Sequence, residues 1–79
     1  MSYAKKNNGS PLAGLGAGLR AIRKEKGISQ EKLALDAGLS RAYVGKLEAA
    51  MVNASVVTLS KMCRVLGVKI SEVFIRGKI

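Results

Sequence analysis

Two cationic side chains, Arg41 and Lys46, stand in the short segment from Ser40 to Glu48. Guanidinium and ammonium groups donate several hydrogen bonds and suit acceptors such as the major-groove edge of guanine. Because Ser40 is a good helix N-cap, Arg41 would lie in a first helical turn, where a cation opposes the helix dipole. Such a local violation is more expected at a functional site, and the alternative is a solvated surface arginine.

The segment around these cations predicts two short helices joined by a tight turn. Ser29 can cap the first helix, and Gly38 can end it in the left-handed conformation. Ser40 then caps a second helix, whose apolar stripe is Val44 and Leu47. Helices so close in sequence must cross at a steep angle, as in a helix-turn-helix. The N-terminal turn of the second helix is the part that enters a DNA major groove in that motif.

Apolar residues that recur every three or four positions predict three further helices, and no segment has a strand pattern. We therefore expect an all-α, compact five-helix bundle. The helices are expected over about 11–26, 56–66 and 72–75, with Ser10, Ser55 and Ser71 as their caps. The glycines at 14, 16 and 18 either fray the first of these helices or permit close packing.

The expected organisation is a single domain over residues 11–76, preceded by a flexible N-terminal arm at 1–10 and followed by a basic end at 77–79. The formal net charge is +9. It is uneven, with +5 over residues 1–26, zero over 27–55 and +4 over 56–79. The excess of positive charge favours an anionic partner. Phosphate contacts would come from the segments that flank the neutral central segment.

Composition argues against several other classes of function. The chain has one cysteine, no histidine and five acidic residues, which leaves no His/Cys metal cluster and no nucleophile–base pair. We expect no metal, no cofactor and no enzymatic activity, with Cys63 as a small core residue. No apolar run is long enough to span a bilayer and no signal peptide is visible, so we expect no membrane partner and a cytoplasmic location.

Most of the chain, about residues 12–75, resembles the Cro/C1-type (XRE family) of helix-turn-helix proteins, which includes lambdoid phage repressors, restriction–modification controller proteins and antitoxins. The resemblance is carried by Leu15-Gly16, Leu19-Arg20, Ile22-Arg23, Gly27-Ile28-Ser29-Gln30, Leu33-Ala34, Gly38-Leu39-Ser40, Tyr43-Val44, Leu47-Glu48, Ser55, Thr58-Leu59, Leu66-Gly67-Val68 and Ser71-Glu72-Val73-Phe74. It implies a lambda-repressor-like DNA-binding domain that binds operator DNA as a homodimer.

The resemblance also implies roles for individual residues. The groove-facing, base-contacting positions would be Ser40, Arg41, Ala42, Gly45 and Lys46. Gln30 would bond a DNA phosphate and brace the second helix of the motif, and Tyr43 would contact the backbone or be a half-buried packing residue. Arg23 and Glu48 match a structural salt bridge of some phage repressors. Further candidate phosphate contacts, chosen by charge, are Lys24, Lys26, Lys61 and Arg64.

The C-terminal region is more apolar than a small domain can easily bury, which predicts a dimer interface. Its expected residues are Val68, Ile70, Val73, Phe74 and Ile75. The chain also departs from the family, because Ala50, Met51 and Val52 stand where a glycine and basic residues often grip a phosphate. These residues could form an apolar loop tip that packs on a partner subunit.

The combined expectation is a sequence-specific transcription regulator on double-stranded DNA, with palindromic half-sites roughly 34 Å apart. RNA polymerase or a cognate toxin are further conceivable partners. The alternative is an antitoxin-like protein–protein interaction module on the same fold, favoured by the neutral central segment and the Met51-Val52 loop.

Overall fold

The computed structural model describes residues 10–79, so the arm predicted at 1–10 lies, apart from Ser10, outside the described residues. The described part contains five α-helices and no strand, which confirms the predicted all-α class. The helices are α1 (Pro11–Glu25), α2 (Gln30–Ala37), α3 (Arg41–Glu48), α4 (Val56–Leu66) and α5 (Ile70–Arg76).

Four serine caps begin four of these helices. The hydroxyls of Ser10, Ser29, Ser40 and Ser55 each accept a hydrogen bond from the backbone N–H three residues later, at 3.0–3.1 Å. The fifth cap prediction was wrong, because α5 begins at Ile70 and Ser71 lies inside it. The N-cap is Lys69, whose side chain makes no capping bond. Ile70 packs against the core, and this contact sets where α5 begins.

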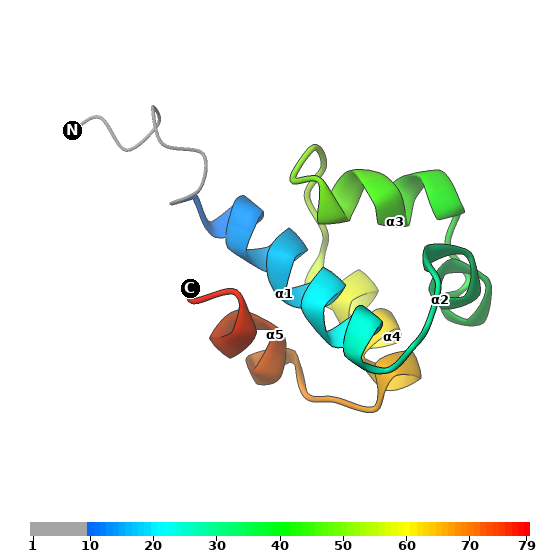
Figure 1. The fold of residues 1–79 in the computed structure, drawn as a ribbon. Coiled ribbons are helices and arrows are strands. Elements are labelled where there is room, and N and C mark those ends of the chain that lie inside the picture. Colours follow the sequence, from blue (N-terminus) through cyan, green and yellow to red (C-terminus); the bar gives the residue numbers. More distant parts are fainter. Residues whose placement is uncertain (1–9) are drawn as a thin grey trace.

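Helix α1 lies at the centre of the arrangement. It contacts α3 on one side and α5 on the other, while α2 contacts α3 and α4 (Figure 1). One continuous core is shared by all five helices. Its most deeply buried large side chains are Leu19, Ile22, Leu33, Val44, Leu47, Met62 and Val73. Since each helix is too short to be stable alone, this shared core stabilises them all.

The glycines of α1 permit close packing, and the helix is continuous from Pro11. A Cβ built on Gly16 would lie 2.5 Å from the backbone oxygen of Leu47, in α3. Gly14 and Gly18 approach the backbone of the α5 region with similar closeness. Side chains at these positions would force the helices apart, so of the two alternatives for these glycines the structure shows close packing.

Three smaller observations complete the fold. Cys63 is 3% exposed within the core, and burial raises the pKa of its thiol, as suits an inert core residue. Within residues 10–79, no three potential His, Cys, Asp or Glu ligands come together. No helix of the described chain combines the length and apolar character that a membrane crossing requires.

Candidate nucleic-acid interface

The α2–turn–α3 unit begins and ends at the residues that the sequence predicted. Gly38 ends α2 in the left-handed conformation, with φ of 72°, and Leu39 N–H donates back to the oxygen of Ala34 at 2.8 Å. The hydroxyl of Ser40 then accepts from Tyr43 N–H and opens α3. The rear of this unit is fully packed, since its apolar residues Leu33, Ala34, Ala37, Val44 and Leu47 are all buried.

The opposite surface of α3 carries most of the predicted base-contacting residues. Ser40, Arg41, Ala42 and Lys46 are exposed. Within residues 10–79, neither Arg41 nor Lys46 forms an ion pair. Gly45 is only half-exposed, and a Cβ there would lie 3.6 Å from the side-chain oxygen of Gln30 in α2. Gly45 therefore lies on the flank of this surface, next to the start of α2.

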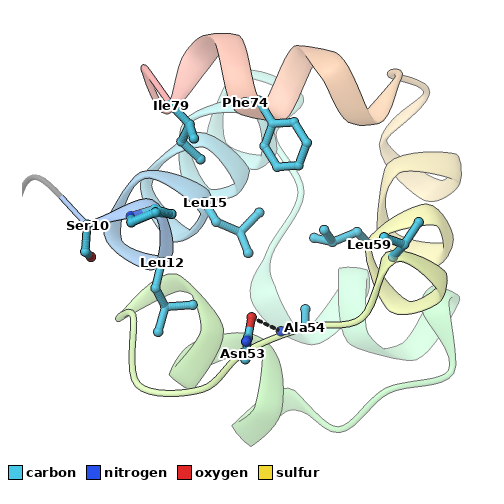
Figure 2. Close-up of a pocket in the computed structure, with 10 residues that line it drawn as sticks. Ser10, Leu12, Leu15, Asn53, Ala54, Leu59, Phe74 and Ile79 are labelled. Carbon is cyan, nitrogen blue, oxygen red and sulfur yellow. Dashed lines mark hydrogen bonds between the residues drawn. The ribbon is translucent and has the colours of Figure 1, made fainter.

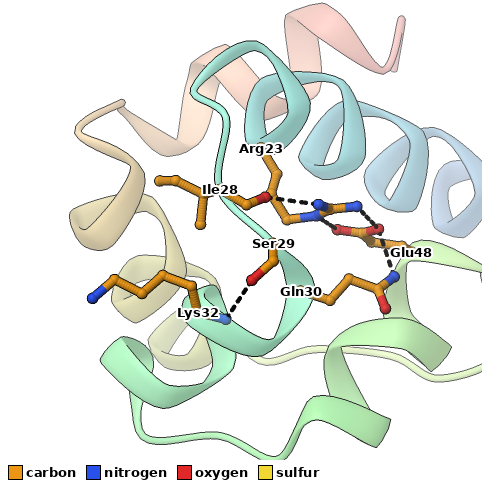
Figure 3. Close-up of polar contacts among 6 residues, drawn as sticks. All are labelled: Arg23, Ile28, Ser29, Gln30, Lys32 and Glu48. Atoms are coloured by element: carbon orange, nitrogen blue, oxygen red, sulfur yellow. Dashed lines mark hydrogen bonds and ion pairs between the residues drawn. The ribbon is translucent and has the colours of Figure 1, made fainter.

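A buried ion pair fixes the C-terminal end of α3 to α1 (Figure 3). Arg23 Nε donates to Glu48 Oε2 at 2.6 Å and its second terminal nitrogen donates to Glu48 Oε1 at 2.9 Å. The two side chains are 9% and 4% exposed. The hydrogen bond to the Glu48 carboxylate raises the pKa of Arg23, so this guanidinium stays charged. The residues that the resemblance paired thus form a bidentate contact.

Two further hydrogen bonds complete this network. The remaining terminal nitrogen of Arg23 donates to the backbone oxygen of Ile28 at 2.8 Å, and Gln30 Nε2 donates to Glu48 Oε1 at 3.0 Å. No buried side-chain nitrogen or oxygen in the described part lacks a partner. Gln30 therefore braces α3 through Glu48.

Tyr43 was predicted to be either a DNA-backbone contact or a half-buried packing residue, and the structure shows it packed. Its ring is half-buried against the core, and its hydroxyl donates to the backbone oxygen of Asn53 at 2.8 Å. The hydroxyl proton is thus already used to tie α3 to the loop before α4. A phosphate could accept it only if the bond to Asn53 broke.

The basic residues at the C-terminal end of α1 have different surroundings. Lys24 and the C-cap residue Lys26 are both exposed, and Lys26 also lines a polar cavity of about 500 Å³ with residues of the α4–α5 turn and of α5. Arg20, which was not among the predicted phosphate contacts, lines a smaller cavity of about 260 Å³ together with Gln30 and Gly45. Its spacing of three residues before Arg23 was the signal that could have identified it.

The loop after α3 holds a non-glycine residue in the left-handed conformation. Ala50 has φ of 62°, while Met51 N–H donates to the oxygen of Lys46 at 2.8 Å. This conformation costs an alanine about 1–2 kcal/mol. Met51 is 70% exposed, but Val52 packs against the core, so only part of the predicted apolar tip faces outward.

The predicted dimer residues divide between core and surface. Val73 is 0% exposed, so its assignment to an interface was wrong, because the small domain does bury it. Val68 and Ile70 are partly buried against the core, whereas Phe74 and Ile75 are exposed.

An apolar groove of about 550 Å³ lies next to this exposed surface and was not predicted. Figure 2 shows Leu12, Leu15, Leu59, Phe74 and Ile79 around it, brought together from α1, α4 and the C-terminal region. Val56, at the start of α4, also lines it and is itself exposed. The exposed apolar surface therefore extends beyond α5 onto α4.

Comparison with known proteins agrees with this geometry. The model of the HTH_3 family, described as helix-turn-helix, matches residues 19–73. This chain belongs to the HTH_3 family. It thus carries a helix-turn-helix DNA-binding domain of the kind found in transcription regulators of the XRE class.

Several named regulators are similar to the chain. It is 37% identical over 59 residues to the immunity repressor protein of Bacillus phage phi105, covering 75% of this chain and 41% of the repressor. It is 40% identical over 57 residues to the control protein C.MunI of a Mycoplasma species, covering 71% of this chain and 77% of C.MunI. The chain thus spans about two fifths of the phage repressor's length.

Solved structures show the same fold. The restriction–modification controller protein C.AhdI of Aeromonas hydrophila has a TM-score of 0.78 and 41% identity, covering 80% of this chain and 96% of C.AhdI. The clp gene regulator ClgR of Corynebacterium glutamicum has a TM-score of 0.85 and 30% identity, covering 87% of this chain and 73% of ClgR. These relatives are regulators and not enzymes, which agrees with the expectation of a non-enzymatic chain.

Proposed function

We propose that this protein is a sequence-specific transcription regulator that binds a palindromic operator as a homodimer, with about residues 40–48 in the major groove. The observation that carries the proposal is the two-sided character of α3. Its outer surface exposes Arg41, Ala42 and Lys46, while its rear is buried and its last residue is held in a satisfied ion pair. A rigidly held helix with unpaired donors on one side suits base recognition, which depends on placement.

The base contacts follow from the side-chain chemistry. Arg41 and Lys46 can donate to guanine O6 and N7, and the methyl group of Ala42 can contact a thymine methyl. Ser40 and Gly45 lie at the edges of the same surface. Each good bidentate contact contributes roughly 1–3 kcal/mol of discrimination against the wrong base.

The phosphate contacts would come from residues beside α3. Gln30 and Arg20 are the strongest candidates, since they share one cavity with Gly45 of α3. Lys24 remains a candidate as an exposed cation of α1. Lys26 is a weaker candidate because it lies by the α4–α5 turn. Tyr43 is weaker because its hydroxyl is bonded to Asn53. Such contacts predict that binding weakens steeply with salt, by nearly one log–log unit for each phosphate neutralised.

The homodimer would use the apolar surface formed by Phe74 and Ile75 of α5, by Val56 and Val57 of α4, and by Ile79. A two-fold axis places the same patch against itself, which covers exposed apolar side chains on both subunits. This arrangement would present two α3 helices to half-sites roughly 34 Å apart. Such a regulator would work in the cytoplasm, with RNA polymerase as a further partner.

The test is selection of bound sequences from a random duplex pool at about physiological salt, followed by affinity measurements on the selected duplex. The double variant Arg41→Ala/Lys46→Ala should lose specific binding by roughly 2–6 kcal/mol. The matched control, Lys61→Ala/Arg64→Ala, removes the same charge from exposed residues of α4. Since these residues are candidate phosphate contacts, the control should weaken specific and non-specific binding alike and leave the ratio of the two affinities unchanged. Equal losses of this ratio in both variants would contradict base recognition by α3.

The second candidate is an antitoxin-like module that binds a partner protein such as a toxin. The exposed Met51 at the loop tip favours it. In that case the Arg41→Ala/Lys46→Ala variant would keep its protein partner, and the random pool would yield no motif.

A further inference from the structure

We infer that Gly16 is a positioning residue for DNA recognition, because its lack of a side chain sets how closely α3 seats on α1. The inference rests on the proposed function, in which α3 contacts bases. Gly16 is buried between the two helices, and the atoms of α3 nearest to it belong to the backbone of Leu47 and Glu48. Its role would thus be indirect, through the placement of α3.

The contact at Gly16 is with the backbone of α3. A Cβ there would lie 2.5 Å from the oxygen of Leu47, 2.7 Å from the oxygen of Glu48 and 3.0 Å from the carbonyl carbon of Glu48. These atoms belong to the last turn of α3, and no side-chain rotation can move them. Even an alanine at position 16 would therefore displace the end of α3 or shift α1.

A second contact holds the same end of α3 in place. Arg23 lies seven residues after Gly16, about two helical turns along the same side of α1, and binds the carboxylate of Glu48. The glycine permits the close approach and the ion pair restrains it. Glycine is also less favourable than alanine inside a helix, so a buried glycine needs a packing reason of this kind.

Displacement of the last turn of α3 should change the contacts between α3 and the DNA bases. Helix α3 has only eight residues, and its close packing makes it move as a rigid body. Its tilt then moves Arg41 and Lys46 relative to the groove. Hydrogen bonds tolerate only a few tenths of an ångström before they weaken, whereas electrostatic contacts with phosphates tolerate more. Sequence preference should therefore suffer more than non-specific binding.

The experiment compares Gly16→Ala with Gly14→Ala, a matched control on the same helix. A Cβ at Gly14 would lie 2.7 Å from the backbone oxygen of Gly77 and from the side chain of Ile79, so it disturbs the C-terminal region instead of α3. Because Ile79 belongs to the proposed dimer surface, affinities are measured for each protein on a duplex with a single half-site of the selected motif, where dimerisation does not enter, and on an unrelated duplex. Folding is checked by circular dichroism at the same temperature, with sucrose added to all samples if a variant is partly unfolded.

Gly16→Ala should lower the ratio of specific to non-specific affinity by roughly 5- to 150-fold, the equivalent of one bidentate contact. On the single half-site, Gly14→Ala should leave the ratio unchanged, even if it weakens dimerisation through Ile79. An unchanged ratio in Gly16→Ala, or equal losses in both variants, would overturn the inference. A merely structural role lowers the folded fraction and weakens both affinities together, which also leaves the ratio unchanged. Failure of the proposed function would differ, because the unchanged protein would then select no motif.

Discussion

Helix α1 contacts α3 along one side and α5 along the other, and the two contacts are held in different ways. Both use glycines of α1 for close backbone approach. The contact with α3 adds the Arg23–Glu48 pair, in which both side chains are less than 10% exposed. The contact with α5 adds the Arg76–Glu25 pair, in which they are 31% and 59% exposed.

The difference lies in what surrounds each pair. Glu48 accepts from Arg23 and Gln30, and Arg23 also donates to a backbone oxygen, so the buried charges are fully bonded. Glu25 and Arg76 have similar geometry, at 3.0 Å and 2.6 Å, but they lie in water and are screened by salt. The buried pair therefore specifies where α3 lies, while the exposed pair only supports α5.

The largest expected effect on stability comes from removing one partner of the buried ion pair. Glu48→Ala leaves Arg23 charged and buried without a partner, which should lower the free energy of unfolding by roughly 3–5 kcal/mol. Urea denaturation measures the loss. The control is Glu25→Ala, the same change in the exposed pair, which should lower stability far less. Similar losses in the two variants would remove the distinction between the contacts.

The next largest effect is a gain in stability in the loop that follows α3. Ala50→Gly should raise the free energy of unfolding by about 1 kcal/mol, because glycine adopts the positive φ of 62° without the cost that alanine bears. Part of that gain is offset by the greater entropy of glycine in the unfolded chain. Thermal denaturation measures it. If the variant were less stable, the methyl group of Ala50 would make a contact that stabilises the fold by more than the backbone strain destabilises it.

A smaller gain is expected from Gly45→Ala, which sharpens the contrast with Gly16. The new Cβ would lie 3.6 Å from the side-chain oxygen of Gln30, an ordinary contact, so the variant should gain about 0.5–1 kcal/mol of helix stability. Chemical denaturation of Gly45→Ala and Gly16→Ala measures the two changes in stability. If Gly45→Ala were as destabilising as Gly16→Ala, the steric account of position 16 would be wrong.

The smallest effect concerns pH and the exposed pair. Hydrogen bonds from Arg76, together with its charge, lower the pKa of Glu25 below its ordinary value of 4.5. A lowered pKa in the folded state contributes stability that is complete above that ordinary value and is lost as the pH falls through the folded value. The difference in urea midpoint between the unchanged protein and Glu25→Gln should therefore shrink from about pH 7 to about pH 3. A difference that grew on acidification would contradict this sign.

Much of the fold could be predicted because its signals are local. Ser10, Ser29, Ser40 and Ser55 act on backbone groups within their own helices, so their roles follow from neighbouring residues. The prediction that Ser71 caps α5 was wrong for the opposite reason. Packing of Ile70 on the core overrides the local capping preference of the serine.

The candidate site was less predictable because its contacts join distant segments. The pairing of Arg23 with Glu48, 25 positions apart, came only from a family resemblance. The tight approach of Gly16 to α3 and the exposure of Val56 depend on how helices cross. Neither periodicity nor composition carries that information.

The most direct test of the account is a parallel selection from one random duplex pool with the unchanged protein and with Arg41→Ala. We expect a palindromic motif for the unchanged protein, with a guanine in each half-site whose preference is lost when Arg41 is replaced. Recovery of the same motif by both proteins would show that α3 does not determine sequence through Arg41. Recovery of no motif by the unchanged protein would contradict sequence-specific recognition altogether.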